Sequence, residues 1–110
     1  MSLDVTPLFS PLTVKGKTLR NRIVMPPMVV NRGIATPQAA EWYGRHARGG
    51  VGLVIIEATD VVLFGQELTA QNLRPTVDAI HAGGALAAIQ IFPGVRLRRT
   101  TPAELSLKDI

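Results

Sequence analysis

An amide and a carboxylate next to apolar runs are the residues of this chain with the clearest chemical potential. Gln90 lies inside the run 86–92, and a buried amide must find hydrogen-bond partners. Its carbonyl and two N–H donors suit a ligand edge that mixes donors and acceptors, such as a flavin pyrimidine, although neighbouring backbone would satisfy it equally well. Glu57 follows the run 51–56. It is either a catalytic carboxylate or, with at least equal support, a buried structural one, because no second acid or His accompanies it.

The segment Pro26-Pro27-Met28-Val29 is a third place where chemistry is expected, because it follows the short apolar run 23–25. Two consecutive prolines remove two backbone donors, so a buried strand, covered on both faces, ends at about Met25. Periodicity alone favours the simpler interpretation that the prolines only stop the strand. If the apolar runs are parallel strands, however, their carboxyl ends share one rim, and this segment becomes a stiff apolar floor for a flat ligand.

The elements that position these residues follow from alternating strand and helix signals. Thr36 and Pro37 are typical of a helix start, and a Gly pair follows each expected helix. The sequence predicts a hairpin over 8–19, strands over 23–25, 51–56 and 86–92, and helices over 36–48 and 72–82. The order strand, helix, strand, helix, strand indicates right-handed βαβ units, a parallel sheet and the α/β fold class.

Composition excludes several classes of protein. The chain has 110 residues, of which 46% are hydrophobic and 18% charged, which predicts one folded domain. The absence of cysteine excludes a disulfide framework and a thiolate metal site, and no metal is expected. No apolar run has the length of a membrane span and no signal peptide is present, so we expect a cytoplasmic protein with no membrane partner.

The net charge of +4 raises the question of phosphate or nucleic-acid binding. Basic residues are dispersed except at Arg96, Arg98 and Arg99, and few aromatic residues accompany them. A nucleic-acid partner is therefore not expected. The three arginines could bind a phosphate, but no Gly-rich cradle precedes them, and a solvated loop is the favoured interpretation.

Several of these stretches together resemble a known family. Four stretches are similar to the Old Yellow Enzyme family of FMN-dependent NAD(P)H:flavin oxidoreductases. They are the segment LFSPLTVKGKTLRNRIVMPPM, the helix start Thr36-Pro37, the strand end Glu57-Ala58-Thr59 and the segment AIHAGGALAAIQIF. The resemblance implies a (β/α)8 TIM barrel with FMN at the carboxyl ends of the strands. Residues 1–110 would then be a partial TIM-barrel domain, with an N-terminal β-hairpin followed by about the first three β/α units.

The resemblance also implies which residues hold the flavin. Pro26, Pro27, Met28 and Val29 would line the isoalloxazine, Ala58 would contact it through its main chain, and Gln90 would hydrogen-bond to the pyrimidine part. The family takes hydride from NAD(P)H and reduces an activated alkene such as an enone, so the expected substrate is a small molecule. The catalytic residues stay unassigned, because the family's substrate-binding pair, proton donor and phosphate site lie further along the barrel.

Departures from the family pattern bear on the chemistry. Val29 stands where many members have Thr or Cys beside the flavin, and Asn31 stands where some have a substrate-contacting Tyr. No His follows Gln90 in the stretch where the family has one. Val29 cannot hydrogen-bond to the flavin, so the resemblance does not extend to the flavin potential.

The last residues favour a chain that continues, because Ser106 and Asp109 have the spacing of a helix start. The leading hypothesis is the N-terminal part of an FMN-dependent oxidoreductase, inactive as 110 residues alone. The alternative is a non-catalytic partial barrel that self-associates through its open strand edges into a homo-oligomer.

Overall fold

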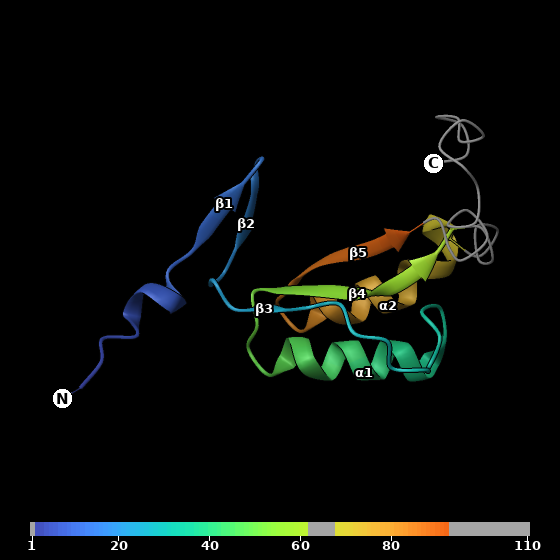
Figure 1. The fold of residues 1–110 in the computed structure, drawn as a ribbon, viewed down its shortest axis with the longest axis horizontal. Helices are drawn as coiled ribbons and strands as arrows, with labels where there is room; N and C mark the ends of the chain where they lie inside the picture. Colours follow the sequence, from blue (N-terminus) through green and yellow to red (C-terminus); the bar gives the residue numbers. More distant parts are fainter. Residues whose placement is uncertain (1, 62–67, 93–110) are drawn as a thin grey trace, which may run out of the picture.

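A three-stranded parallel sheet, covered on one face by two helices, forms the centre of the molecule (Figure 1). The computed structural model describes residues 2–61 and 68–92. In chain order its elements are η1 (Thr6–Phe9), β1 (Leu12–Val14), β2 (Lys17–Leu19), β3 (Val24–Met25), α1 (Pro37–Arg48), β4 (Leu53–Asp60), α2 (Ala70–Ala82) and β5 (Leu86–Phe92). Arg96, Arg98, Arg99 and the helix start expected at Ser106 lie outside the described residues.

The first helix begins where the sequence predicts it. The Thr36 hydroxyl accepts a hydrogen bond from the Ala39 amide at 3.0 Å, and Pro37 occupies the first helical position, where its missing N–H costs nothing. The fully buried face of α1 carries Ala39, Tyr43 and Ala47, a spacing of four residues that places them in one stripe. This stripe packs into the same core as Val54 and Ile56 of β4.

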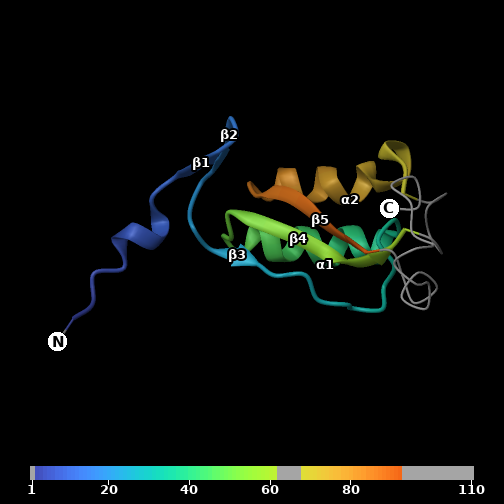
Figure 2. The same ribbon diagram turned by 45° about the horizontal axis from the view of Figure 1, so that its top comes forward.

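The sheet has the order β3-β4-β5, and both neighbouring pairs are parallel. Met25, Val54 and Ile56 are buried on the side of the helices, whereas the alternate residues face the other way. On that open face Val24 is 41% exposed, so the expectation that the strand at 23–25 is buried on both faces is wrong. The reason is that no described element covers this face of the sheet (Figure 2).

The fourth strand is longer than the sequence predicts. The expected strand covers 51–56, but β4 runs over Leu53–Asp60, so Glu57, Ala58 and Thr59 lie within the strand and not after it. A register shift between Ile56 and Thr59 interrupts its pairing with β5. The buried polar side chains are tolerated there because they are hydrogen-bonded: Glu57 accepts from the Tyr43 hydroxyl, and the Thr59 hydroxyl donates to the Glu57 carbonyl.

Arg20 and Asn21 fix the turn that leads into β4, at the end of the sheet opposite the rim. Arg20 donates to the Ala47 carbonyl at 2.6 Å and to the Val51 carbonyl at 2.9 Å, and the Asn21 amide donates to the Gly50 carbonyl at 2.6 Å. These bonds hold the last turn of α1 and the turn that follows it against the segment before β3. The predicted hairpin, β1 with β2, is antiparallel and stands beside this amino-terminal end (Figure 1). In the described residues, no helix is long and apolar enough to cross a membrane.

Candidate functional site

The bulge in β4 brings two of the predicted site residues together. Ile56 pairs with Ile89, and Thr59 pairs with Ile91, so three steps along β4 match two steps along β5. Gln90 therefore lies opposite the bulged residues Glu57 and Ala58. Because the two strands are parallel, this meeting point is at their carboxyl ends, where parallel-sheet proteins place ligands.

The segment after β3 supplies the next side of the same rim. Val29 and Ala58 line one cavity of about 260 Å³. The other residues that line it are Asn31, Gly33, Ile34, Glu57 and Thr59. We refer to this space as the rim cavity. It lies between the loop that connects β3 to α1 and the carboxyl end of β4. This position agrees with the expectation that the strand ends share one rim.

The predicted site residues differ in how far they are exposed. Met28 is 52% exposed and Val29 is 61% exposed, which leaves apolar surface at the rim available to a ligand. Pro26 is exposed and Pro27 is half-buried. Gln90 is exposed on the open face of the sheet, so the expectation that its amide is buried among apolar residues is wrong. The amide is accessible because the described chain does not cover that face.

Glu57 is buried and bound on both sides of its carboxylate. The Tyr43 hydroxyl donates to Glu57 Oε1 at 3.0 Å, and the Val30 amide donates to Oε2 at 3.4 Å. The same hydroxyl accepts a hydrogen bond from the Glu57 backbone N–H at 3.0 Å. Burial and the neighbouring Glu57 carboxylate raise the pKa of Tyr43 to about 12, against the bond from the Glu57 N–H, which lowers it.

Sequence reasoning missed Tyr43, which the helical spacing places in the apolar stripe of α1. The signal that could have found it is the combination of a phenol on a buried helix face and an acid at the end of a buried strand, because each needs a partner. Of the two interpretations of Glu57, the structure favours the hydrogen-bonded structural one.

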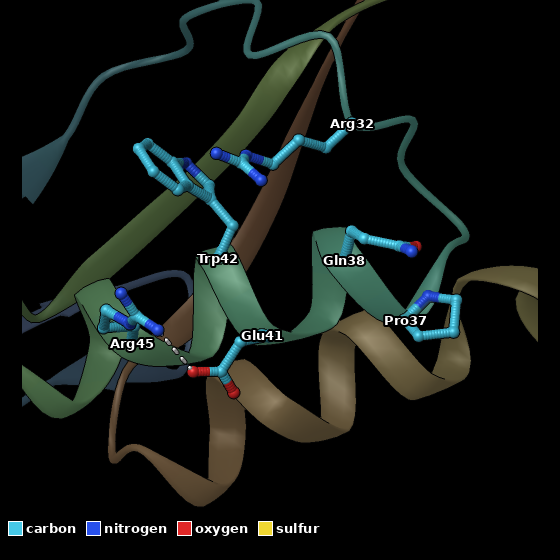
Figure 3. A pocket seen from close by; sticks show the side chains of 6 residues that line it. All are labelled: Arg32, Pro37, Gln38, Glu41, Trp42 and Arg45. Carbon is cyan, nitrogen blue, oxygen red and sulfur yellow. Dashed lines mark hydrogen bonds and ion pairs between the residues drawn. The ribbon is translucent and has the colours of Figure 1, made fainter.

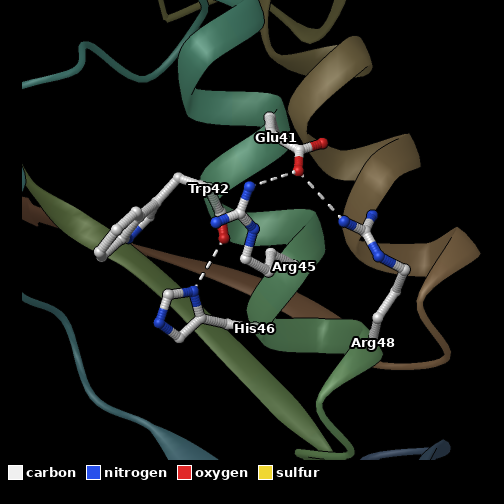
Figure 4. Close-up of polar contacts among 5 residues, drawn as sticks. All are labelled: Glu41, Trp42, Arg45, His46 and Arg48. Atoms are coloured by element: carbon white, nitrogen blue, oxygen red, sulfur yellow. Dashed lines mark hydrogen bonds and ion pairs between the residues drawn. The ribbon is translucent and has the colours of Figure 1, made fainter.

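A second cavity, of about 340 Å³, lies beside α1 and shares no lining residue with the rim cavity (Figure 3). In it the Arg32 guanidinium lies 4.8 Å from the centre of the Trp42 ring. Glu41 binds Arg45 at 3.1 Å and Arg48 at 3.3 Å (Figure 4), and these bonds lower the pKa of the exposed Glu41 carboxyl. Exposed pairs of this kind contribute little to stability.

The two histidines lie on helices. His46 Nδ1 lies 2.8 Å from the Trp42 carbonyl, within the same helix (Figure 4), and His81 lies in the last turn of α2. Neither residue lines the rim cavity. Within 2–61 and 68–92, no group of three or more His, Asp or Glu side chains is placed to hold a metal ion.

Comparison with known proteins agrees with this arrangement. Residues 7–104 match the NADH:flavin oxidoreductase / NADH oxidase family. The Old Yellow Enzyme homologue from Zymomonas mobilis is 28% identical, with a TM-score of 0.63 over 76% of this chain and 27% of that chain. Old Yellow Enzyme from Pichia sp. AKU4542 is 26% identical, with a TM-score of 0.63 over 78% and 26%.

Histamine dehydrogenase from Rhizobium sp. 4-9 is also similar, at 26% identity and a TM-score of 0.66 over 78% of this chain and 15% of that one. The present chain thus spans about a quarter of the Old Yellow Enzyme structures that it matches. These matches confirm the expected fold, a hairpin followed by the first β/α units of a TIM barrel. The described residues do not close a barrel.

Proposed function

The chain belongs to the NADH:flavin oxidoreductase / NADH oxidase family, and from this premise we propose that its rim holds the ring of FMN in an enzyme that reduces activated alkenes. The observation that carries the proposal is the register at the bulge, which sets Gln90 beside Ala58 while Ala58 and Val29 line one cavity. Three strand ends thus contribute to one surface.

The residues at the rim suit a flat ring with one polar edge. Met28 and Val29 present exposed apolar side chains, which can cover the face of such a ring, and Pro26 and Pro27 keep this segment stiff. Gln90 offers a carbonyl and an NH₂ group, which match an edge with both donors and acceptors. In the described part of the chain no Lys or Arg lines the rim cavity, so the proposal covers the ring and not the phosphate.

Each residue has a separate role in the proposed enzyme. FMN bound here would supply the redox chemistry, the transfer of a hydride from NAD(P)H to one carbon of an activated alkene whose other carbon gains a proton. The segment from Pro26 to Val29 excludes water from one face of the ring. Ala58 contacts the ring through its main chain, and Gln90 fixes the orientation of the polar edge. We assign no proton donor to this chain and expect 110 residues alone to be inactive.

The test is made on protein purified from the natural reading frame. We expect a yellow protein that oxidises NADH or NADPH in the presence of a small enone such as cyclohexenone. A Gln90→Leu variant should bind FMN about tenfold more weakly, because it loses hydrogen bonds worth about 1.5 kcal/mol. The matched control is Gln38→Leu, which removes an exposed amide from the outer side of α1 and should leave FMN affinity unchanged. A colourless protein that takes up no FMN would refute the proposal.

A further inference from the structure

Glu57 links three elements: α1, the loop after β3 and the bulge in β4. Glu57 is not among the residues assigned to the flavin. Its carboxylate accepts from Tyr43 of α1 and from Val30 of the loop after β3, and its backbone belongs to the bulge in β4. We propose that the Tyr43–Glu57 pair is a positioning unit that holds this loop and the bulge in register, so that the ring-binding residues meet. The proposal rests on the proposed function and names a role for residues that do not themselves touch the ring.

The Tyr43 hydroxyl is fixed because it both donates and accepts. It donates to Glu57 Oε1 and accepts from the Glu57 N–H, both at 3.0 Å, and its residue is fully buried. The Thr59 hydroxyl donates to the Glu57 carbonyl at 2.9 Å. Side chains therefore bind both backbone groups of the first bulged residue, where a regular strand would use its neighbours.

The second oxygen of the carboxylate binds the loop after β3 and so links this loop to α1 and β4. Glu57 Oε2 accepts from the Val30 N–H at 3.4 Å, and Val30 directly follows Val29, which is 61% exposed at the rim. Val29 lacks the packing that would hold it in place, so its position depends on its backbone neighbours. Loss of the carboxylate would release the Val30 amide, whereas the Ile34 end of the loop stays bound to the Thr76 hydroxyl at 2.7 Å and Ala39 and Ala47 stay packed in the core.

Hydrogen exchange of single amides tests the role without requiring bound flavin. In Glu57→Leu, which removes both acceptor oxygens, the Val30 amide should exchange about tenfold faster, whereas core amides such as those of Ala47 and Val54 keep their protection. Glu57→Gln retains one amide oxygen and should restore part of the protection. The control is Glu41→Leu, which removes an exposed carboxylate from α1 and should leave Val30 unchanged.

If Glu57→Leu does not fold, Tyr43→Phe provides the same test, because it keeps the carboxylate but removes its anchor on α1. Val30 should again exchange faster than in the unmodified chain. Unchanged exchange at Val30 in the folded variants would overturn the proposal, and so would an equal loss of protection at Val30, Ala47 and Val54, which indicates global destabilisation.

A parallel titration with FMN separates this proposal from the proposed function. We expect the variants that release Val30 to bind FMN about tenfold more weakly than the unmodified protein. Release of Val30 with unchanged FMN affinity would overturn the positioning role. Failure of the unmodified protein to bind FMN would overturn the proposed function, whereas the exchange data would still decide whether Glu57 holds the loop.

Discussion

At the scale of single residues, the surroundings of Tyr43 make its phenol unusually hard to ionise. The hydroxyl lies in the core against the Glu57 carboxylate, and burial with that negative charge raises its pKa to about 12. We therefore expect the phenolate absorbance of the folded protein to appear only near that pH. The chain has a single Tyr, so ultraviolet titration reports this residue directly.

The same shift predicts how stability depends on pH. The pKa of Tyr43 in the folded protein is above the ordinary value of 10.0. The contribution of the protonated phenol to the free energy of unfolding is therefore complete below pH 10.0 and is lost as the pH rises towards about 12. Urea melts at increasing alkaline pH should show the midpoint falling in this window. Tyr43→Phe, which has no proton to lose, should flatten this part of the profile. A phenol that titrates near its ordinary pKa in the folded protein would contradict the buried Tyr43–Glu57 bond.

At the scale of elements, the loop between β3 and α1 depends on Gly33. Its φ is +72°, a region that favours glycine, and an added Cβ would lie 2.9 Å from Thr36 Cγ2. Thr36 cannot turn aside without losing its bond to the Ala39 amide. We expect Gly33→Ala to destabilise the fold by about 1–3 kcal/mol, measured by urea unfolding.

Gly16 supplies the control for this prediction. It has a similar φ of +76° in the hairpin turn, but an added Cβ would meet nothing within 4 Å. Gly16→Ala therefore measures the backbone cost alone, about 1 kcal/mol. Equal effects of the two substitutions would show that Gly33 makes no steric demand on the cap of α1.

Local signals explain why most elements could be predicted from the sequence. The start of α1 follows from Thr36-Pro37 and its end from the following Gly pair, because capping is decided by adjacent residues. The order of strands and helices follows in the same way from apolar runs. The site was less predictable: the bulge in β4 depends on its pairing with β5, and the bond between Tyr43 and Glu57 joins two elements.

At the scale of the whole molecule, the open face and edges of the sheet determine how the chain behaves alone. Among the described residues β3 and β5 each have one strand neighbour, and Val24 and Ile91 are 41% and 59% exposed. Unpaired edges with apolar residues favour association. The exposures of Val24 and Gln90 were not predictable from the sequence, because they depend on what covers this face.

We therefore expect the 110-residue chain to self-associate as its concentration rises. Sedimentation velocity should show a growing oligomer fraction, which Val24→Lys should reduce, because a lysine on an exposed strand opposes edge pairing. Val5→Lys, at a 51% exposed position before η1, is the matched control. A chain that sediments as a monomer at every concentration would exclude association through the sheet.

The most direct test of the central claim is where FMN binds on this chain. In a nitrogen-15 labelled sample titrated with FMN, we predict that the largest shifts occur at the backbone amides of Met28, Val29 and Ala58 and at the side-chain NH₂ of Gln90. The amide of Gln38, beside the separate cavity on α1, should move little. Shifts centred on that cavity, or no shifts up to the solubility of FMN, would contradict the assignment of the rim as the flavin site.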